Sequence, residues 1–152
     1  MSKRLSLTLM ILGLVLFEIS IASAHYPILV GDRSTIMGGQ GGNITLTYGR
    51  GHLHAPQWTD APAPDWIKAY TFDGMTEDLT GKTYVEGLTR KLNFPVKRIG
   101  DTWIVFHLPL AWSDEDRAWT ETTVRTVIHL GLSRGWETPL GLPLEIVPLN
   151  RP

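Results

Sequence analysis

Histidine is the residue type with the clearest capacity for chemistry in this chain, which contains five histidines and no cysteine. Without cysteine there can be no disulfides, thiolate zinc sites, iron–sulfur clusters or cysteine nucleophiles. A metal site would therefore draw its ligands from histidine, carboxylate, amide or the chain terminus. Three histidines, His25, His52 and His54, have positions that suit metal binding.

His25 follows a segment with the layout of a secretory signal peptide. Two basic residues precede an apolar run, Leu5–Phe17, and Ala22-Ser23-Ala24 forms a small-residue cleavage site. The apolar run is too short for a comfortable membrane span, which needs about 20 residues. Cleavage after Ala24 would make His25 the first residue of a periplasmic or secreted protein. The alternative is an uncleaved N-terminal anchor.

An N-terminal histidine can chelate a metal before the fold contributes anything, since its α-amine and its ring Nδ1 can bind one ion. The amine has a reference pKa of about 7.7–8.0, so a metal can displace its proton near neutral pH. One more imidazole would complete a histidine brace, which suits Cu(II) or Ni(II). His52 and His54 are two residues apart. An extended backbone would place both rings on one side, so that either or both could ligate.

The other polar clusters favour structural interpretations. His107 lies in an otherwise apolar strand and is interpreted as a hydrogen-bonded core histidine. His129 shares a predicted strand face with Thr123 and Arg125, which indicates an outer-face residue. The acidic run 114–116 lacks the alternating ligands and glycine of a calcium loop. No Gly-x-Ser-x-Gly motif or Ser/His/Asp set is visible, so nothing points to an enzyme.

The elements that position these histidines are expected to be strands. Polar and apolar residues alternate in 43–48 and in 121–130, as in half-buried strands. Thr102–Leu108 is apolar on both faces, which indicates a central strand. Further strands are expected over 66–72, 144–147, 28–30 and 82–92, with a turn at Asp73-Gly74. About seven strands without helical periodicity predict an all-β, antiparallel, immunoglobulin-like β-sandwich.

Length and composition agree with one folded domain over residues 25–152. The chain has 152 residues, of which 43% are hydrophobic and 19% charged, so it is neither disordered nor long enough for two typical domains. A formal net charge of −1 gives no field that would recruit a phosphate backbone, and nucleic acid is therefore excluded as a partner.

Several motifs resemble those of domain-of-unknown-function family 4198, a family of secreted bacterial proteins. Ala24-His25-Tyr26-Pro27 is similar to the family's Ala-His-aromatic start. Tyr48-Gly49-Arg50-Gly51-His52 resembles its strand followed by Gly-His, and Asp60-Ala61-Pro62 resembles the start of its next conserved run. The most specific similarity is the segment from Gly141 to Pro152, which matches a Gly-x-Pro-Leu-Glu-Ile-Val-Pro-Leu-x-Arg-Pro pattern.

The resemblance implies a β-sandwich of the cell envelope. It also implies a part in metal uptake, since some members are encoded beside nickel and cobalt uptake systems. It places His25 and His52, with His54 as a further candidate, on positions where such members carry histidine. Members usually continue past the Arg-Pro segment into a second β-domain, whereas this sequence stops at Pro152.

Taken together, the sequence predicts extracytoplasmic binding of a divalent transition metal (nickel, cobalt or copper) by His25, His52 and His54. The protein would capture the metal and pass it to a membrane transporter, with no membrane span of its own after signal cleavage. One alternative is a structural or interaction module of the envelope without metal, and another is a copper-brace oxidase.

We predict that the secreted protein begins at His25, because a small-residue cleavage site follows the apolar run. Mass spectrometry of the mature N-terminus measures this directly. A start at any other residue would remove the brace, since an amide nitrogen cannot cheaply replace the free amine.

Overall fold

The computed structural model describes residues 26–37, 41–52, 55–113, 117–131, 135, 137 and 139–142, with backbone only for His52, Ala55 and Pro56. These residues form strands and no helix, and so include no helix long and apolar enough to cross a membrane. The strands are β1 (Tyr26–Gly31), β2 (Thr35–Ile36), β3 (Gly42–His52), β4 (Ala55–Asp60), β5 (Trp66–Thr71), β6 (Thr76–Asp78), β7 (Tyr84–Glu86), β8 (Thr89–Val96), β9 (Gly100–Ser113) and β10 (Ala118–Leu130).

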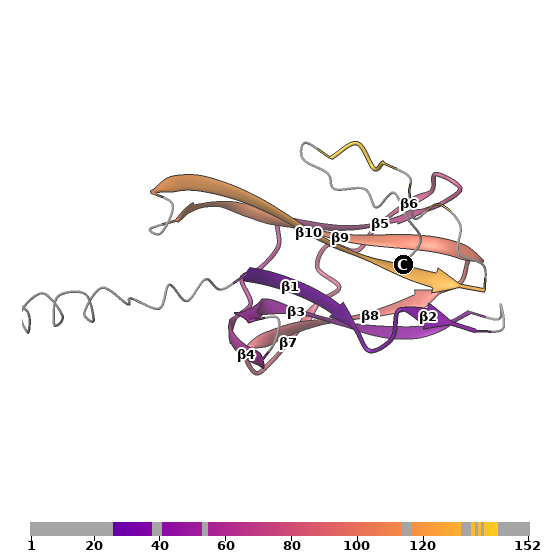
Figure 1. The fold of residues 1–152 in the computed structure, drawn as a ribbon, viewed down its shortest axis with the longest axis horizontal. Helices are drawn as coiled ribbons and strands as arrows, with labels where there is room; N and C mark the ends of the chain where they lie inside the picture. The colour runs from indigo at the N-terminus through magenta and orange to yellow at the C-terminus, as the bar shows by residue number, and fades with distance from the viewer. Residues whose placement is uncertain are drawn as a thin grey trace, which may run out of the picture.

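The strands form two sheets that face each other (Figure 1). One sheet has the order β1-β3-β8-β7, with β4 also paired to β3, and the other has the order β2-β10-β9-β5-β6. All pairs are antiparallel except β2 with β10. The two orders match strands A-B-E-D and G-F-C of an immunoglobulin sandwich, with β2 added beside G and β6 beside C. The predicted immunoglobulin-like β-sandwich is therefore confirmed.

The core lies between the two sheets and is built from alternate residues of each long strand. Tyr48 of β3 and Phe106 of β9 meet near its centre, with ring centroids 5.2 Å apart, and both side chains are fully buried. Alternation places every second residue on the inner face, and the other inward residues of the long strands are Ile44, Leu46, Ile67, Ala69, Leu92, Phe94, Val96, Ile104, Leu108, Ile128 and Leu130.

The described residues form ten strands, more than the expected seven or so. Strands β2, β6 and β7 have only two or three residues, which is too short for alternation to be visible in the sequence. The single strand expected over 82–92 is divided into β7 and β8 by a turn at Gly87, whose φ is 59°. The strand expected over 144–147 lies outside the described residues.

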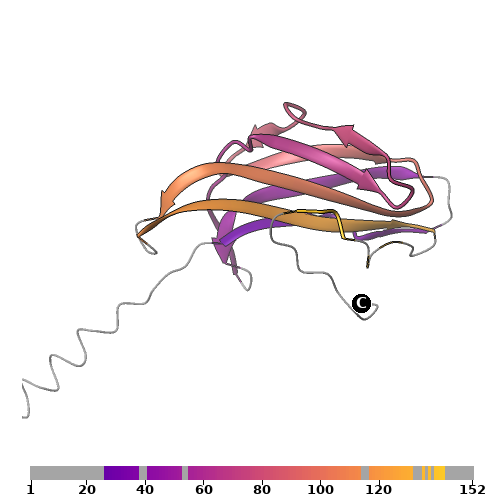
Figure 2. The same ribbon diagram turned by 90° about the horizontal axis from the view of Figure 1, so that it is seen from above.

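The β9–β10 hairpin is longer than the sequence indicated. Its strands have 14 and 13 residues, and the hairpin projects past the other strands at the end of the sandwich where β1 begins (Figures 1 and 2). Near its tip Trp112 and Trp119 lie directly opposite each other, edge to face, with centroids 5.8 Å apart. Both rings are at least half exposed.

We expect Phe106→Ala to lower the free energy of unfolding by about 3–5 kcal/mol, because it removes a buried ring and leaves a cavity between the sheets. Urea denaturation measures the change. Tyr84→Ala, at an exposed aromatic of β7, is the control and should cost less than about 1 kcal/mol. Equal losses for the two variants would place the core elsewhere.

Candidate metal site

The structure describes only part of the predicted metal site. His52 is the last residue of β3, and its side chain is not described. His25 and His54 lie outside the described residues. Within the described ranges, no group of three or more histidine, aspartate and glutamate side chains could hold a metal ion. The described residues closest in sequence to these histidines lie in β1, β3 and β4.

The register of β1 against β3 is continuous up to the last described pair. Tyr26 lies opposite Gly51, and the pairing runs without a shift to Gly31 opposite Leu46. The Asp32 N–H donates to the Thr45 carbonyl at 3.0 Å, which assigns the hydrogen-bonded pairs of this ladder to even-numbered residues of β1. Pro27 occupies an intervening position, where a strand needs no N–H toward its partner.

Two glycines allow β4 to fold closely over the end of β3. A Cβ at Gly49 would lie 2.8 Å from the Trp58 ring, and a Cβ at Gly51 would lie 3.0 Å from the Gln57 carbonyl oxygen. The last residue of β3, His52, pairs with the first residue of β4, Ala55. The prediction that His52 and His54 point to one side requires an extended backbone as far as residue 54. β3 ends at His52 and His54 lies outside the described residues, so this point stays a prediction.

Near the end of β3, the two arginines Arg50 and Arg90 both have partners. Arg50 lies 3.6 Å from the Asp60 carboxylate across the β3–β4 pair, and the Arg90 Nε–H donates to the Ala61 carbonyl at 2.9 Å. Burial raises the pKa of Tyr48 to about 12, with a smaller opposing effect from Arg50. The Tyr48 hydroxyl therefore stays neutral at physiological pH and adds no negative charge to this part of β3.

His107 is hydrogen-bonded, as expected, but it lies on the outer face of its sheet and not in the core. Its Nε2 lies 2.7 Å from Glu121 Oε1, and its ring stacks on Trp66 with centroids 4.8 Å apart. The Asp65 carboxylate is 3.9 Å from Nδ1, too far for a hydrogen bond. The neighbouring residue Phe106 takes the inward position, so alternation turns His107 outward.

His129 is on the outer face of β10, as expected, and it pairs with a residue that the sequence analysis did not identify. Its Nδ1 lies 2.7 Å from Asp101 Oδ1, and Asp101 is completely buried. The two residues are opposite each other in the β9–β10 ladder. Only the hairpin register brings them together, and the sequence alone does not specify that register.

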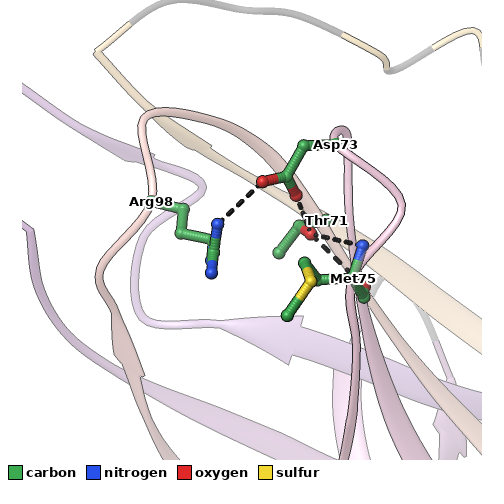
Figure 3. A network of polar contacts seen from close by, with 4 residues as sticks. All are labelled: Thr71, Asp73, Met75 and Arg98. Carbon is green, nitrogen blue, oxygen red and sulfur yellow. Dashed lines mark hydrogen bonds and ion pairs between the residues drawn. The ribbon is translucent and has the colours of Figure 1, made fainter.

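A cavity of about 330 Å³ lies at the other end of the sandwich, between the β5–β6 hairpin and the end of β8. Ala69 and Phe94 contribute apolar surface to its lining, and Arg98 is one of the charged residues that line it. Figure 3 shows the adjoining turn, in which the Thr71 hydroxyl donates to Asp73, and Arg98 pairs with the same carboxylate at 2.7 Å. The Thr71 hydrogen bond, followed by Arg98, lowers the pKa of Asp73.

Comparisons with models of protein families, with curated proteins and with solved structures find no match for this chain. The fold assignment therefore rests on strand order and pairing alone. The resemblance to family 4198 stays a prediction.

We expect Gly49→Ala to lower the free energy of unfolding by about 1–3 kcal/mol, since the added methyl meets the Trp58 ring and the Asp60 carbonyl. Gly42→Ala, on the same strand, is the control, because its Cβ would meet only the Ile36 side chain, most closely Cδ1 at 3.3 Å. Adding Trp58→Ala should remove most of the extra cost of Gly49→Ala. Additive losses in a denaturation experiment would show that Trp58 does not pack on Gly49.

Proposed function

We propose that the protein binds a divalent transition metal outside the cytoplasm through His25 and His52, as an accessory component of nickel, cobalt or copper uptake. The observation that supports the proposal is the β1–β3 register. It is continuous to Tyr26 opposite Gly51, and in the sequence His25 precedes Tyr26 and His52 follows Gly51. One further pair in the same register would bring these two histidines together.

The parity of that pair favours a shared ligand site. Hydrogen-bonded pairs fall on even-numbered residues of β1, so a His25–His52 pair would be of the non-hydrogen-bonded kind, with Cα atoms about 4.5 Å apart. Directly opposed residues carry their side chains on one face. The nitrogen of His25 would not be required by the ladder, which leaves the amine of a processed terminus for the metal.

The donor set then contains three nitrogens, namely the amine and ring of His25 and the ring of His52. His54 follows His52 by two residues and is a candidate fourth donor. Nitrogen sites bind divalent ions in the order Co < Ni < Cu > Zn. Cu(II) should therefore bind most tightly in vitro, while metal availability and the transporter that receives the ion determine the cellular cargo.

We expect calorimetric titration with Cu(II) and Ni(II) to give the highest affinity for protein that begins at His25. A single glycine added before His25 displaces the amine, and His52→Ala removes an imidazole, so each change should weaken binding about tenfold or more. Binding should also weaken as the pH falls through about 6.5, the reference pKa of histidine, because protons compete for the ligands.

The control variant is His129→Gln, whose amide can still donate to the buried Asp101, and its affinity should equal that of the unaltered protein. If the glycine-extended protein binds as tightly as the native terminus, the site lies elsewhere. If no form binds metal, the protein is better described as an envelope module without metal.

A further inference from the structure

In the part of the chain that the structure describes, the outer edge of β10 is paired only near its C-terminal end. On one side β10 pairs with β9 from Ala118 to Leu130. On the other side, β2 is the only described strand that pairs with β10, at His129 and Leu130, and β1 passes close to β10 without pairing to it. An unpaired edge of this length is a template for another strand.

Hydrogen bonds to the β2 side show which residues of β10 face this edge. The N–H groups of His129 and Gly131 donate to the carbonyls of Ser34 and Ile36 at 2.8 and 3.1 Å. In a strand, the backbone N–H and C=O groups of every second residue point to the same side. The odd-numbered residues of β10 therefore direct these groups away from β9, toward the outer edge. The extra residue at the β9–β10 irregularity is on β9, between Leu108 and Ala111, so β10 keeps this parity to its start.

The sequence of β10 before His129 lacks several of the features that usually prevent edge-to-edge association. Residues 118–128 contain no proline, glycine or lysine, and these are among the devices with which natural edge strands avoid pairing. Six of the eleven residues are threonine or valine, which favour extended structure. Only two side chains in the segment are charged, Glu121 and Arg125.

We propose that two copies of this chain associate through this edge, with their β10 strands antiparallel about a two-fold axis at Thr123. This register places Thr123 opposite itself and Glu121 of each copy opposite Arg125 of the other. Odd residues then face odd residues, as the direction of the N–H groups requires. Opposite charges on facing strands attract. A two-fold axis at residue 121 would instead place Glu121 opposite its own copy, and an axis at residue 125 would do the same for Arg125, so that like charges would face each other.

Side chains on the outer face are arranged to support this register. Glu121 is held by His107 at 2.7 Å, and the Arg125 guanidinium lies 4.7 Å from the centroid of the Trp103 ring. The same register places Trp119, the most exposed tryptophan near the hairpin tip, opposite Val127 of the second copy. The contact is isologous, so it closes at two copies and does not propagate.

Sedimentation and light scattering of the purified protein over a concentration series measure the association. The unaltered protein should form dimers, and Glu121→Arg or Arg125→Glu alone should weaken dimerisation about tenfold or more. An equimolar mixture of these two variants should regain dimers, since each copy then offers the charges that the other lacks. Circular dichroism checks that the variants keep the strand content of the parent.

A backbone test uses Thr123→Pro, which removes an outward N–H that β9 does not use and is tolerated on an edge strand. It should abolish dimers, while Thr123→Val, which keeps the N–H, should not. A monomer at all concentrations would overturn the proposal. So would concentration-independent protection of the amides of residues 121, 123 and 125 from hydrogen exchange, because the edge would then be covered within one copy. A dimer that persists in Thr123→Pro would place the interface elsewhere.

Discussion

The packing of Tyr48 against Phe106 is the contact on which the arrangement of this protein depends. These rings join the two sheets at the centre of the core, 5.2 Å apart, and both are completely shielded from solvent. A slip of one residue in either strand would turn every side chain of that strand to the opposite face. The cost of exposing Tyr48, Phe106 and their aliphatic neighbours therefore fixes the parity of β3 and β9, and through their ladders that of β1 and β10.

That parity determines which polar groups meet on the outer face of the second sheet. Because Phe106 points inward, His107 points outward, where Trp66 and Glu121 surround its ring. The same alternation places His129 beside Asp101, and it directs the backbone of Thr123 toward the open edge of β10. In the other sheet, β3, the strand that carries Tyr48, continues through Arg50 to His52. The proposed metal ligands and the proposed dimer contact thus both follow from the inward positions of the core.

The sequence predicted the inner parts of the long strands from two kinds of pattern. Polar and apolar residues alternate in 43–48 and 121–130, whereas Thr102–Leu108 is apolar on both faces, as suits a central strand that is paired on both sides. A strand as short as β6 has too few residues to show a hydrophobic period, and it is defined by its pairing with β5. The contacts of His107 and His129 were not predictable for a related reason. Asp101 and Glu121 reach these rings across strand pairs, and their positions depend on the hairpin register and its irregularity between Thr120 and Thr122.

The continuation of the β1–β3 register to His25 and His52 is the central claim, and nuclear magnetic resonance can measure it without any metal. In a non-hydrogen-bonded antiparallel pair the two Hα atoms are close, because the Cα atoms are only about 4.5 Å apart. In protein that begins at His25, we expect a nuclear Overhauser effect between the Hα atoms of His25 and His52. The corresponding effect between Pro27 and Arg50, an opposed pair in the ladder, is the internal reference. A clear Pro27–Arg50 effect with none between His25 and His52 would contradict the claim.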